Sequence, residues 1–583
     1  MVAPVHEGCV PDPAVSQLLD AGGSVEETVG PAEEAPSERS HAHADHLFIG
    51  RVVTMDEGRP HAGAVAVKHG HIVGVGTVAE LQEHVGPLTR TVELGDDVLY
   101  PGLVEPHMHL WVTALIYRWI DCSPLRHGSL EEVFDELKAA ASSAKPGAWI
   151  LGSGFDPSLF PGFPEFGRKE LDAVSADHPV AVMNTSMHFS YVNSKALEIA
   201  GITDDAPDPP GGHFGRDADG RLNGVLGEMG AVGVLLKYID RLSLRSLVDN
   251  IHAITDDAAR VGVTTMREAA TGALMGEKEI TLLRALSTLG RLRTRISLAV
   301  LDDKATEWDS KHVQPGAGND RVWIGARKIV GDGSNQGRSG YLHEPYLGTT
   351  ERGAMNIEPS ALVERIAWCE EHGWQLMVHA NGDATTQLVA EAYEKALGGR
   401  PGKDLRHRIE HCSLVDDGVF ETMASVGVSP SFLINHVYFW GQTLRDNLLG
   451  PERIQLLDRT AQASAAGLRF SLHSDYNVSP INPLHYVRVA ATRDMVGGGT
   501  LNEAERVSVH QALRAVTIDA AWQLHADDVL GSISVGKHAD FVVLDRDPEE
   551  VDPREIDQIR VLETWMGGKR TYRAEDSGSR SRP

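Results

Sequence analysis

Cysteine is scarce in this chain: 583 residues contain four, namely Cys9, Cys122, Cys369 and Cys412. They form no CxxC pair and show no spacing typical of a disulfide framework, so we expect a reducing compartment and thiols that mainly pack. The first 20 residues lack the basic and apolar segments of a signal peptide. No run approaches the roughly 18 apolar residues of a membrane span. These absences predict a cytoplasmic protein without a membrane partner.

Positive charge is also in deficit, with 54 Lys and Arg against 82 Asp and Glu and a formal net charge of −28. An acidic surface repels phosphate backbones, so nucleic acid is not expected as a partner. Aromatic residues make up only 6% of the chain, but apolar residues reach 42%, a normal globular balance. We therefore expect a small-molecule substrate as partner, and a homodimer is left open.

The composition divides the chain into segments. Residues 1–45 show no sustained period and predict a disordered or loosely attached tail, and residues 573–583 are expected to be frayed. Residues 46–97 carry short β-branched strands separated by Gly turns, and residues 531–572 return to this character in VLGSISVGKHADFVVLDRD. We expect these two segments to form one composite β-sandwich domain from both ends of the chain.

Between residues 98 and 530, short apolar runs alternate with helical patterns, which is typical of βα units around a parallel sheet. The predicted strands are DVLYPGLV, HPVAVMN, GVTTM, RVWIGARKIV, WQLMV, HRIEH and LRFSLHSD. About eight repeats fit, with insertions within residues 155–250. The predicted fold class is α/β, a (β/α)8 TIM-like barrel joined to the composite β-sandwich.

Two histidines follow the first predicted barrel strand, in the segment YPGLVEPHMH. His107 and His109 lie at i and i+2 on extended backbone, so their side chains point the same way and can chelate one divalent cation. The spacing alone is weak evidence, because HxH pairs also occur at residues 41–43 and 69–71. His107 and His109 differ from the other two pairs in their position, since TIM-barrel active sites lie at the carboxyl ends of the strands.

Four further candidate ligands end later predicted strands: Lys328, His379, His411 and Asp475. A single histidine after an apolar strand is usually a buried structural residue. Four such side chains at corresponding strand ends would face one mouth of the barrel and could converge on one point. The sequence therefore predicts a metal centre there.

These motifs resemble the amidohydrolase superfamily, and the wider pattern resembles its YtcJ-like branch, which includes N-substituted formamide deformylases. The resemblance rests on PGLVEPHMH, on the Lys and DGS of the fourth strand, and on VHANGD, RIEH and HSD. Further matches are GSGFDPSLFP, HFSYVNSKAL, DPPGGHFGRDADGRLNGVLGE, NVSPINPL and VGKHADFVVLD. The resemblance covers residues 46 to about 570, with the motifs in the family's order.

The resemblance implies a divalent metal cofactor, with zinc expected and one or two ions. His107, His109 and Asp475 would hold one ion, and His379 and His411 a second. Lys328 would bridge the two as a carbamate, because an unmodified ammonium cannot bind a cation. The alternative for Lys328 is an ordinary lysine paired with Asp332, which leaves a single-metal centre.

A metal-bound hydroxide would attack the substrate carbon, with Asp475 as general base. His188 is the expected donor to the leaving nitrogen; the alternative is a buried hydrogen-bonding histidine in a loop. His473 stands where the family pattern has Gly, and it either lines the pocket or packs behind Asp475. The strand-four continuation DGSNQGRSGY also departs from the family pattern.

The aromatic run SFLINHVYFWG follows the seventh predicted strand and could be plain packing or a pocket wall. The expected substrate-pocket residues are Trp111, Phe155, Glu268, Phe432, Tyr438, Trp440 and His473, with Phe160, Phe189 and Phe439 beside them.

The predicted activity is hydrolysis of a non-peptide C–N bond, an N-substituted formamide or related amide. A cyclic amide or imine hydrolase, or a deaminase, would use the same centre, because loops set the substrate. From another class, the chain could be an inactive regulatory or scaffold protein. The retention of six candidate ligands argues against that alternative.

Overall fold

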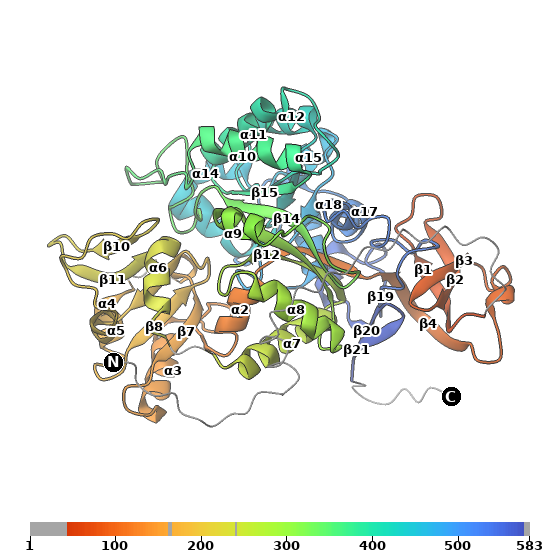
Figure 1. The fold of residues 1–583 in the computed structure, drawn as a ribbon, viewed down its shortest axis with the longest axis horizontal. Helices are drawn as coiled ribbons and strands as arrows, with labels where there is room; N and C mark the ends of the chain where they lie inside the picture. The colour runs from red at the N-terminus through yellow and green to blue at the C-terminus, as the bar shows by residue number, and fades with distance from the viewer. Residues whose placement is uncertain (1–42, 161–165, 240–241, 576–583) are drawn as a thin grey trace.

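The computed structural model describes residues 43–160, 166–239 and 242–575. Within these ranges the strands form three sheets, of seven, six and eight strands, and Figure 1 shows them side by side with the eight-stranded sheet in the centre. The expected tails fall largely outside the described residues. None of the described helices combines the length and hydrophobicity that a membrane crossing needs.

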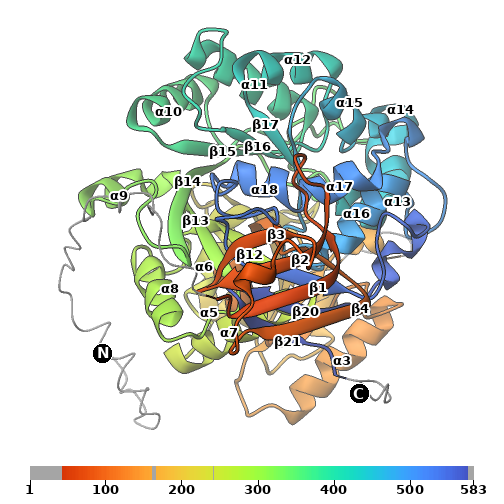
Figure 2. The same cartoon turned by 90° about the vertical axis from the view of Figure 1, so that its right-hand side faces the viewer.

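The seven-stranded sheet joins the two ends of the chain, in the order β21-β20-β19-β4-β1-β2-β3. Its strands are β1 (His46–Val53), β2 (His61–Lys68), β3 (His71–Gly76), β4 (Arg90–Pro101), β19 (Phe541–Leu544), β20 (Val561–Met566) and β21 (Lys569–Arg573). β4 pairs antiparallel with β19, and Phe48 packs edge-on against both Phe541 and Trp565. Figure 2 shows the red and orange strands β1 to β4 beside the blue strand β20. The two chain ends therefore share one sheet and core, and a sandwich of two sheets stays a prediction.

The eight-stranded sheet is a nearly closed, all-parallel barrel, in the order β5-β12-β13-β14-β15-β16-β17-β18. Its strands are β5 (Leu103–Met108), β12 (Val263–Thr271), β13 (Arg295–Leu301), β14 (Val322–Val330), β15 (Gln375–Ala380), β16 (Arg408–His411), β17 (Ser429–Phe432) and β18 (Ser471–Leu472). Between β5 and the segment after β18, Met108 forms an isolated parallel β-bridge with Tyr476, and the His109 amide donates to the Tyr476 carbonyl at 2.7 Å. The barrel expected from the βα repeats is confirmed.

Helices cover the outside of this barrel, and the longest are α7 (Leu244–Arg260), α8 (Lys278–Thr288), α10 (Pro359–His372), α11 (Asp383–Leu397), α12 (Asp417–Val426) and α16 (Pro483–Thr492). Ser243 caps the N-terminus of α7, because its hydroxyl accepts from the Ser246 amide, and the helix buries Leu247, Ile251 and Ile254 on one face. Shorter helices on the barrel side are α2 (Leu110–Ile116), α9 (Ala305–Ser310), α13 (Gly441–Thr443), α14 (Gly450–Arg453), α15 (Thr460–Ala465), α17 (Val509–Ala515) and α18 (Ile518–Gln523).

Two predicted barrel strands need correction. DVLYPGLV is divided at Gly102: Tyr100 belongs to β4 of the first sheet, and the barrel strand β5 begins at Leu103. A Cβ on Gly102 would lie 2.2 Å from the Thr264 hydroxyl, so the crossing between the sheets requires glycine. HPVAVMN is β8 (Val180–Asn184), which belongs to the six-stranded sheet and pairs antiparallel with its neighbour β9 (Phe189–Val192).

The six-stranded sheet is an insertion between α2 and α7, in the order β10-β11-β9-β8-β7-β6. Its other strands are β6 (Ile120–Asp121), β7 (Ile150–Phe155), β10 (His213–Arg216) and β11 (Leu222–Gly227), and its helices are α3 (Leu130–Ser143), α4 (Arg168–Asp172), α5 (Ser194–Ala200) and α6 (Glu228–Leu236). Separate apolar clusters surround β8, which explains why its fully buried run resembles a parallel barrel strand.

The three described cysteines, Cys122, Cys369 and Cys412, are unpaired and buried, as expected for packing thiols. Burial raises the pKa of Cys122 and of Cys369 to about 12.

Candidate metal centre

Three predicted ligands meet at the carboxyl end of the barrel. Asp475 Oδ1 lies 3.0 Å from His109 Nε2 and 3.3 Å from His107 Nε2. Ligand atoms about 2.0–2.1 Å from a tetrahedral ion are about 3.3 Å apart, so these separations suit a zinc-sized cation. Asp475 Oδ1 is buried and accepts no hydrogen bond from the described residues, which leaves it available to a cation.

The other three predicted ligands border this triad. The ring centroids of His379 and His411 are 4.4 Å apart, those of His107 and His411 are 4.9 Å apart, and Lys328 Nζ lies 3.4 Å from His107 Nε2. His379 Nε2 lies 3.2 Å from the Gly333 carbonyl oxygen and 3.0 Å from Asn381 Nδ2, so polar groups hold the ring in place. The structure therefore brings all six candidates to one end of the barrel.

The backbone is left-handed at two of these positions. His411 has φ 63° and Asp475 has φ 55°, a region that side chains other than glycine rarely adopt. Such conformations cost about 1–3 kcal/mol each and concentrate at functional sites. Both residues stand where a strand ends, so the unusual backbone turns their side chains at the barrel mouth.

Burial favours the uncharged imidazoles that a cation needs. It lowers the pKa of His107, of His379 and of His411 well below the ordinary value, and Lys328 reinforces the effect electrostatically. Burial also lowers the pKa of Lys328 to about 8. For Asp475 burial acts in the opposite direction, but the electrostatic effect of the His109 imidazole, whose Nε2 lies 3.0 Å from Oδ1, outweighs it and lowers the pKa of that carboxyl.

Lys328 forms no ion pair with Asp332 in the described structure, contrary to the alternative considered for it. The Asp332 carboxylate instead accepts from the backbone amides of Tyr341, Asn381 and Gly382. Burial raises the pKa of Asp332 to about 6. Lys328 is therefore directed at His107, and the bridging carbamate stays a prediction.

Glu410 is a site residue that the sequence reasoning missed. Its fully buried carboxylate accepts a hydrogen bond from His107 Nδ1, which directs His107 Nε2 toward Asp475. Arg408 holds the same carboxylate, through Nε at 2.7 Å and Nη2 at 2.8 Å. A carboxylate behind a histidine ligand fixes the ring and raises its basicity. The motif HRIEH carried the signal, since Glu410 directly precedes a candidate ligand.

His188 enters the site from the inserted sheet. Its ring centroid lies 5.9 Å from that of His379, and its Nδ1 lies 2.7 Å from Glu228 Oε2, a partner that the sequence reasoning also missed. Burial disfavours the imidazolium, but the hydrogen bond and charge of Glu228 outweigh it and raise the pKa of His188. A histidine so held can present Nε2 to a bound molecule.

His473 packs beneath the centre. It is fully buried and stacks on His107 with centroids 4.7 Å apart and planes at 15°. Its Nε2 lies 3.3 Å from the Ser431 carbonyl oxygen, and burial lowers its pKa to about 3. Of the two roles expected for His473, the structure supports packing.

A comparison with protein families identifies the family of the chain, because a family model described as "Amidohydrolase family" matches residues 90–572. The chain belongs to the amidohydrolase family. It is a hydrolase that acts on carbon–nitrogen bonds, and the expected resemblance to the YtcJ-like branch is confirmed.

Individual relatives of this amidohydrolase cover nearly the whole chain. It is 28% identical over 550 residues to the N-substituted formamide deformylase of Arthrobacter pascens, covering 91% of this chain and 98% of the relative. It is 27% identical over 531 residues to the putative amidohydrolase YtcJ of Bacillus subtilis strain 168, covering 90% and 98%. An uncharacterized metal-dependent hydrolase from Pyrococcus horikoshii has the same fold, with a TM-score of 0.68, 22% identity and coverage of 87% and 99%.

The residues expected to line a substrate pocket occupy different environments. Phe155 stacks on Phe166 in the core of the insertion, and Phe432 packs on Phe470 in the barrel core. Trp111 is fully buried, and its amide donates to Glu268 on β12. Burial raises the pKa of Glu268.

The aromatic run after β17 forms a π-helical turn, η4 (His436–Trp440). Tyr438 lies under the Arg488 guanidinium, whereas Trp440 donates through Nε1 to Asp156 at 2.7 Å. Trp440 and Phe439 also line a cavity of about 280 Å³ between the barrel and the insertion.

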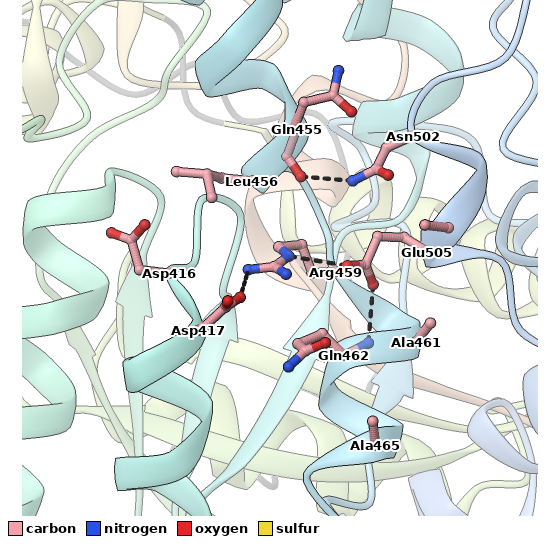
Figure 3. A pocket seen from close by; sticks show the side chains of 11 residues that line it. Asp416, Asp417, Gln455, Leu456, Arg459, Ala461, Gln462, Ala465, Asn502 and Glu505 are labelled. Carbon is pink, nitrogen blue, oxygen red and sulfur yellow. Dashed lines mark hydrogen bonds and ion pairs between the residues drawn. The ribbon is translucent and has the colours of Figure 1, made fainter.

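Another pocket lies away from this centre, and its lining contains none of the candidate ligands. Its volume is about 740 Å³, and Figure 3 shows Asp417, Arg459 and Glu505 on its walls, between α12 and α15. Arg459 pairs with both carboxylates, so the polar groups there satisfy one another.

Proposed function

We propose that this amidohydrolase cleaves the amide bond of an N-substituted formamide or a closely related amide with the help of a divalent metal ion, zinc being the expected metal. The observation that carries the proposal is the convergence of His107 Nε2, His109 Nε2 and Asp475 Oδ1 at separations that fit a small cation. His379 and His411 would hold a second ion, and Lys328, as a carbamate, would link the two ions.

The chain's own residues would position the substrate and move protons. When bound, the cation supplies Lewis acidity that polarises a carbonyl and acidifies water. Asp475, ionised because His109 stabilises its charge, would accept the proton of the attacking water. His188, held through Nδ1 by Glu228, would donate a proton from Nε2 to the departing nitrogen. The two proton-transfer groups would thus come from the barrel and the insertion.

The formamide assignment is supported by the relative from Arthrobacter pascens, whose printed name gives that activity. The two proteins match over 91% of this chain and 98% of the relative, that is, over nearly their full lengths. A soluble cytoplasmic location accompanies this proposal as an expectation from the sequence.

Metal analysis and a substrate screen test the proposal. We expect at least one equivalent of metal per chain after metal-supplemented expression, and amine release from formamides that is lost in Asp475→Asn. Metal below about 0.3 equivalents per chain would contradict the proposed metal-dependent reaction. Hydrolysis of cyclic ureas would favour the cyclic amide hydrolase, and release of ammonia from aminopurines would favour the deaminase, if no amine is released from formamides or N-acyl amines.

A further inference from the structure

The cavity between the barrel and the insertion is built from both units. From the barrel side come Thr113 and Ile116 on α2, Tyr117 at its end and the loop that follows Asp475. From the insertion come Ser153, Leu159 and Thr185. Trp440 fixes one wall, because its hydrogen bond to Asp156 ties the π-helical turn to the end of β7. Cavities where two units meet are common places for ligands.

The cavity adjoins the proposed metal centre. Tyr476, part of its lining, directly follows Asp475, and its carbonyl oxygen accepts from the His109 amide at 2.7 Å. Thr113 lies one turn into α2, the helix that begins just after His109, and its amide donates to the His109 carbonyl. A molecule with its reacting carbon at the centre could therefore extend into this cavity.

The lining selects for an uncharged apolar group. Aromatic and aliphatic side chains dominate it, and the residues that line it include Asp121 but no lysine, arginine or histidine. Leu125, another lining residue, is 54% exposed, so the described residues leave part of this apolar side chain uncovered. A carboxylate would meet Asp121 and no cation, which disfavours an anionic ligand.

The size of the cavity suits a ring. A 150 Å³ apolar cavity is large enough for benzene, so about 280 Å³ accommodates a phenyl ring with a short linker. A methyl group would leave most of this space unused.

We propose that this cavity binds an uncharged, ring-sized apolar substituent on the nitrogen of the substrate, and that it excludes substituents bearing a carboxylate. This inference rests on the proposed function, because it assumes that an amide carbon is held at the metal centre. Leu159, Leu125 and the aromatic residues Phe439 and Trp440 would then select the amine, whereas Asp475 takes part in the chemistry.

Three formamides test the inference on the metal-loaded full-length protein: N-methylformamide, N-(2-phenylethyl)formamide and N-formylphenylalanine, the last two differing only by a carboxylate. We expect kcat/KM for the phenylethyl compound to exceed that of each of the others by about 100-fold. Leu159→Trp, which fills the cavity, should reduce the preference over N-methylformamide at least about tenfold, mainly through KM. Leu159→Val is its matched control and should keep the preference.

A surface variant covers the case in which Leu159→Trp does not fold. Leu125→Glu changes an exposed side chain and should also reduce the preference for the phenylethyl compound over N-methylformamide. Equal kcat/KM for the three compounds, or variants with unchanged preference, would overturn the inference.

Calorimetric binding of 2-phenylethanol separates this inference from the proposed function, because it needs no reaction. Saturable binding to the wild type that Leu159→Trp weakens at least about tenfold supports the cavity, even if no formamide is cleaved. Absence of binding, or equal binding by that variant, contradicts it.

Discussion

Replacing Glu410 by Gln should weaken metal binding while leaving every proposed ligand in place. The carboxylate accepts from His107 Nδ1 and is held by Arg408, so it sets both the orientation and the basicity of the His107 ring. Loss of such an outer partner costs about 10–100-fold in metal affinity, which corresponds to about 1.4–2.7 kcal/mol. The variant should therefore show a metal Kd raised by that factor.

The same substitution also weakens a buried ion pair, which must be separated from the effect on the metal. Arg408 and Glu410 are both fully buried, and removal of one charge from such a pair costs up to about 3–5 kcal/mol of stability. Arg408 keeps Ser431 Oγ, 2.9 Å from Nη2, as an acceptor, which limits the loss. Glu505→Gln is the matched control, because Glu505 is a nearly buried partner of Arg459 at 2.9 Å in a pocket without candidate ligands.

Competition with a chromophoric zinc chelator measures the affinity, and thermal unfolding with and without zinc measures the linked stability. We expect the zinc-induced stabilisation of Glu410→Gln to be smaller than that of the wild type, whereas Glu505→Gln should lose stability but keep the wild-type Kd. A folded Glu410→Gln protein with a Kd within twofold of the wild type would refute the orienting role of Glu410.

The remaining predictions concern the bridge, the proton donor and one buried carboxyl. Lys328→Ala should lose one metal ion per chain and most activity, with partial rescue by short carboxylic acids; wild-type activity of this variant would rule out a bridging carbamate. His188→Asn should lower kcat by about 10²–10⁴-fold at unchanged metal content, and Glu228→Gln should lower it less; a kcat equal to that of the wild type in His188→Asn would remove it as donor. Burial raises the pKa of Glu279 from 4.5 to about 7, so the folded protein binds this proton more tightly and the free energy of unfolding should fall as pH rises between these values. Relative to Glu279→Gln, the wild type should lose about 3 kcal/mol across that window in urea unfolding, and a constant difference would contradict the assignment.

The barrel and the six ligand candidates could be predicted because each depends on a local pattern. An apolar run followed by His379, by His411 or by Asp475 is visible within a few residues, and a parallel barrel gathers such strand ends at one mouth. The decoy pair at residues 69–71 shows the value of position: His69 is largely exposed, and His71 packs on His538 at the composite sheet.

The inserted sheet could not be recognised from the sequence because its hydrophobic pattern is the same as that of the barrel strands. β8 is buried along its whole length and is rich in valine and alanine, so periodicity cannot tell it from a parallel barrel strand. Only its antiparallel pairing with β9 separates the two, and pairing is a property of residues brought together by folding.

The carboxylates behind the histidines were missed for a related reason, which also indicates where sequence reasoning could improve. Glu410 contacts a histidine 303 positions away, and Glu228 contacts one 40 positions away, so neither pair has a spacing that a motif could express. A buried histidine ligand nevertheless requires an acceptor for its second nitrogen. For His107, β16 supplies that acceptor one residue before another ligand candidate. The left-handed backbone of His411 (φ 63°) interrupts the alternation of the strand, so Glu410 and His411 both lie against His107. A glutamate directly before a histidine that ends a barrel strand is therefore a reason to search for a second histidine behind which it can lie.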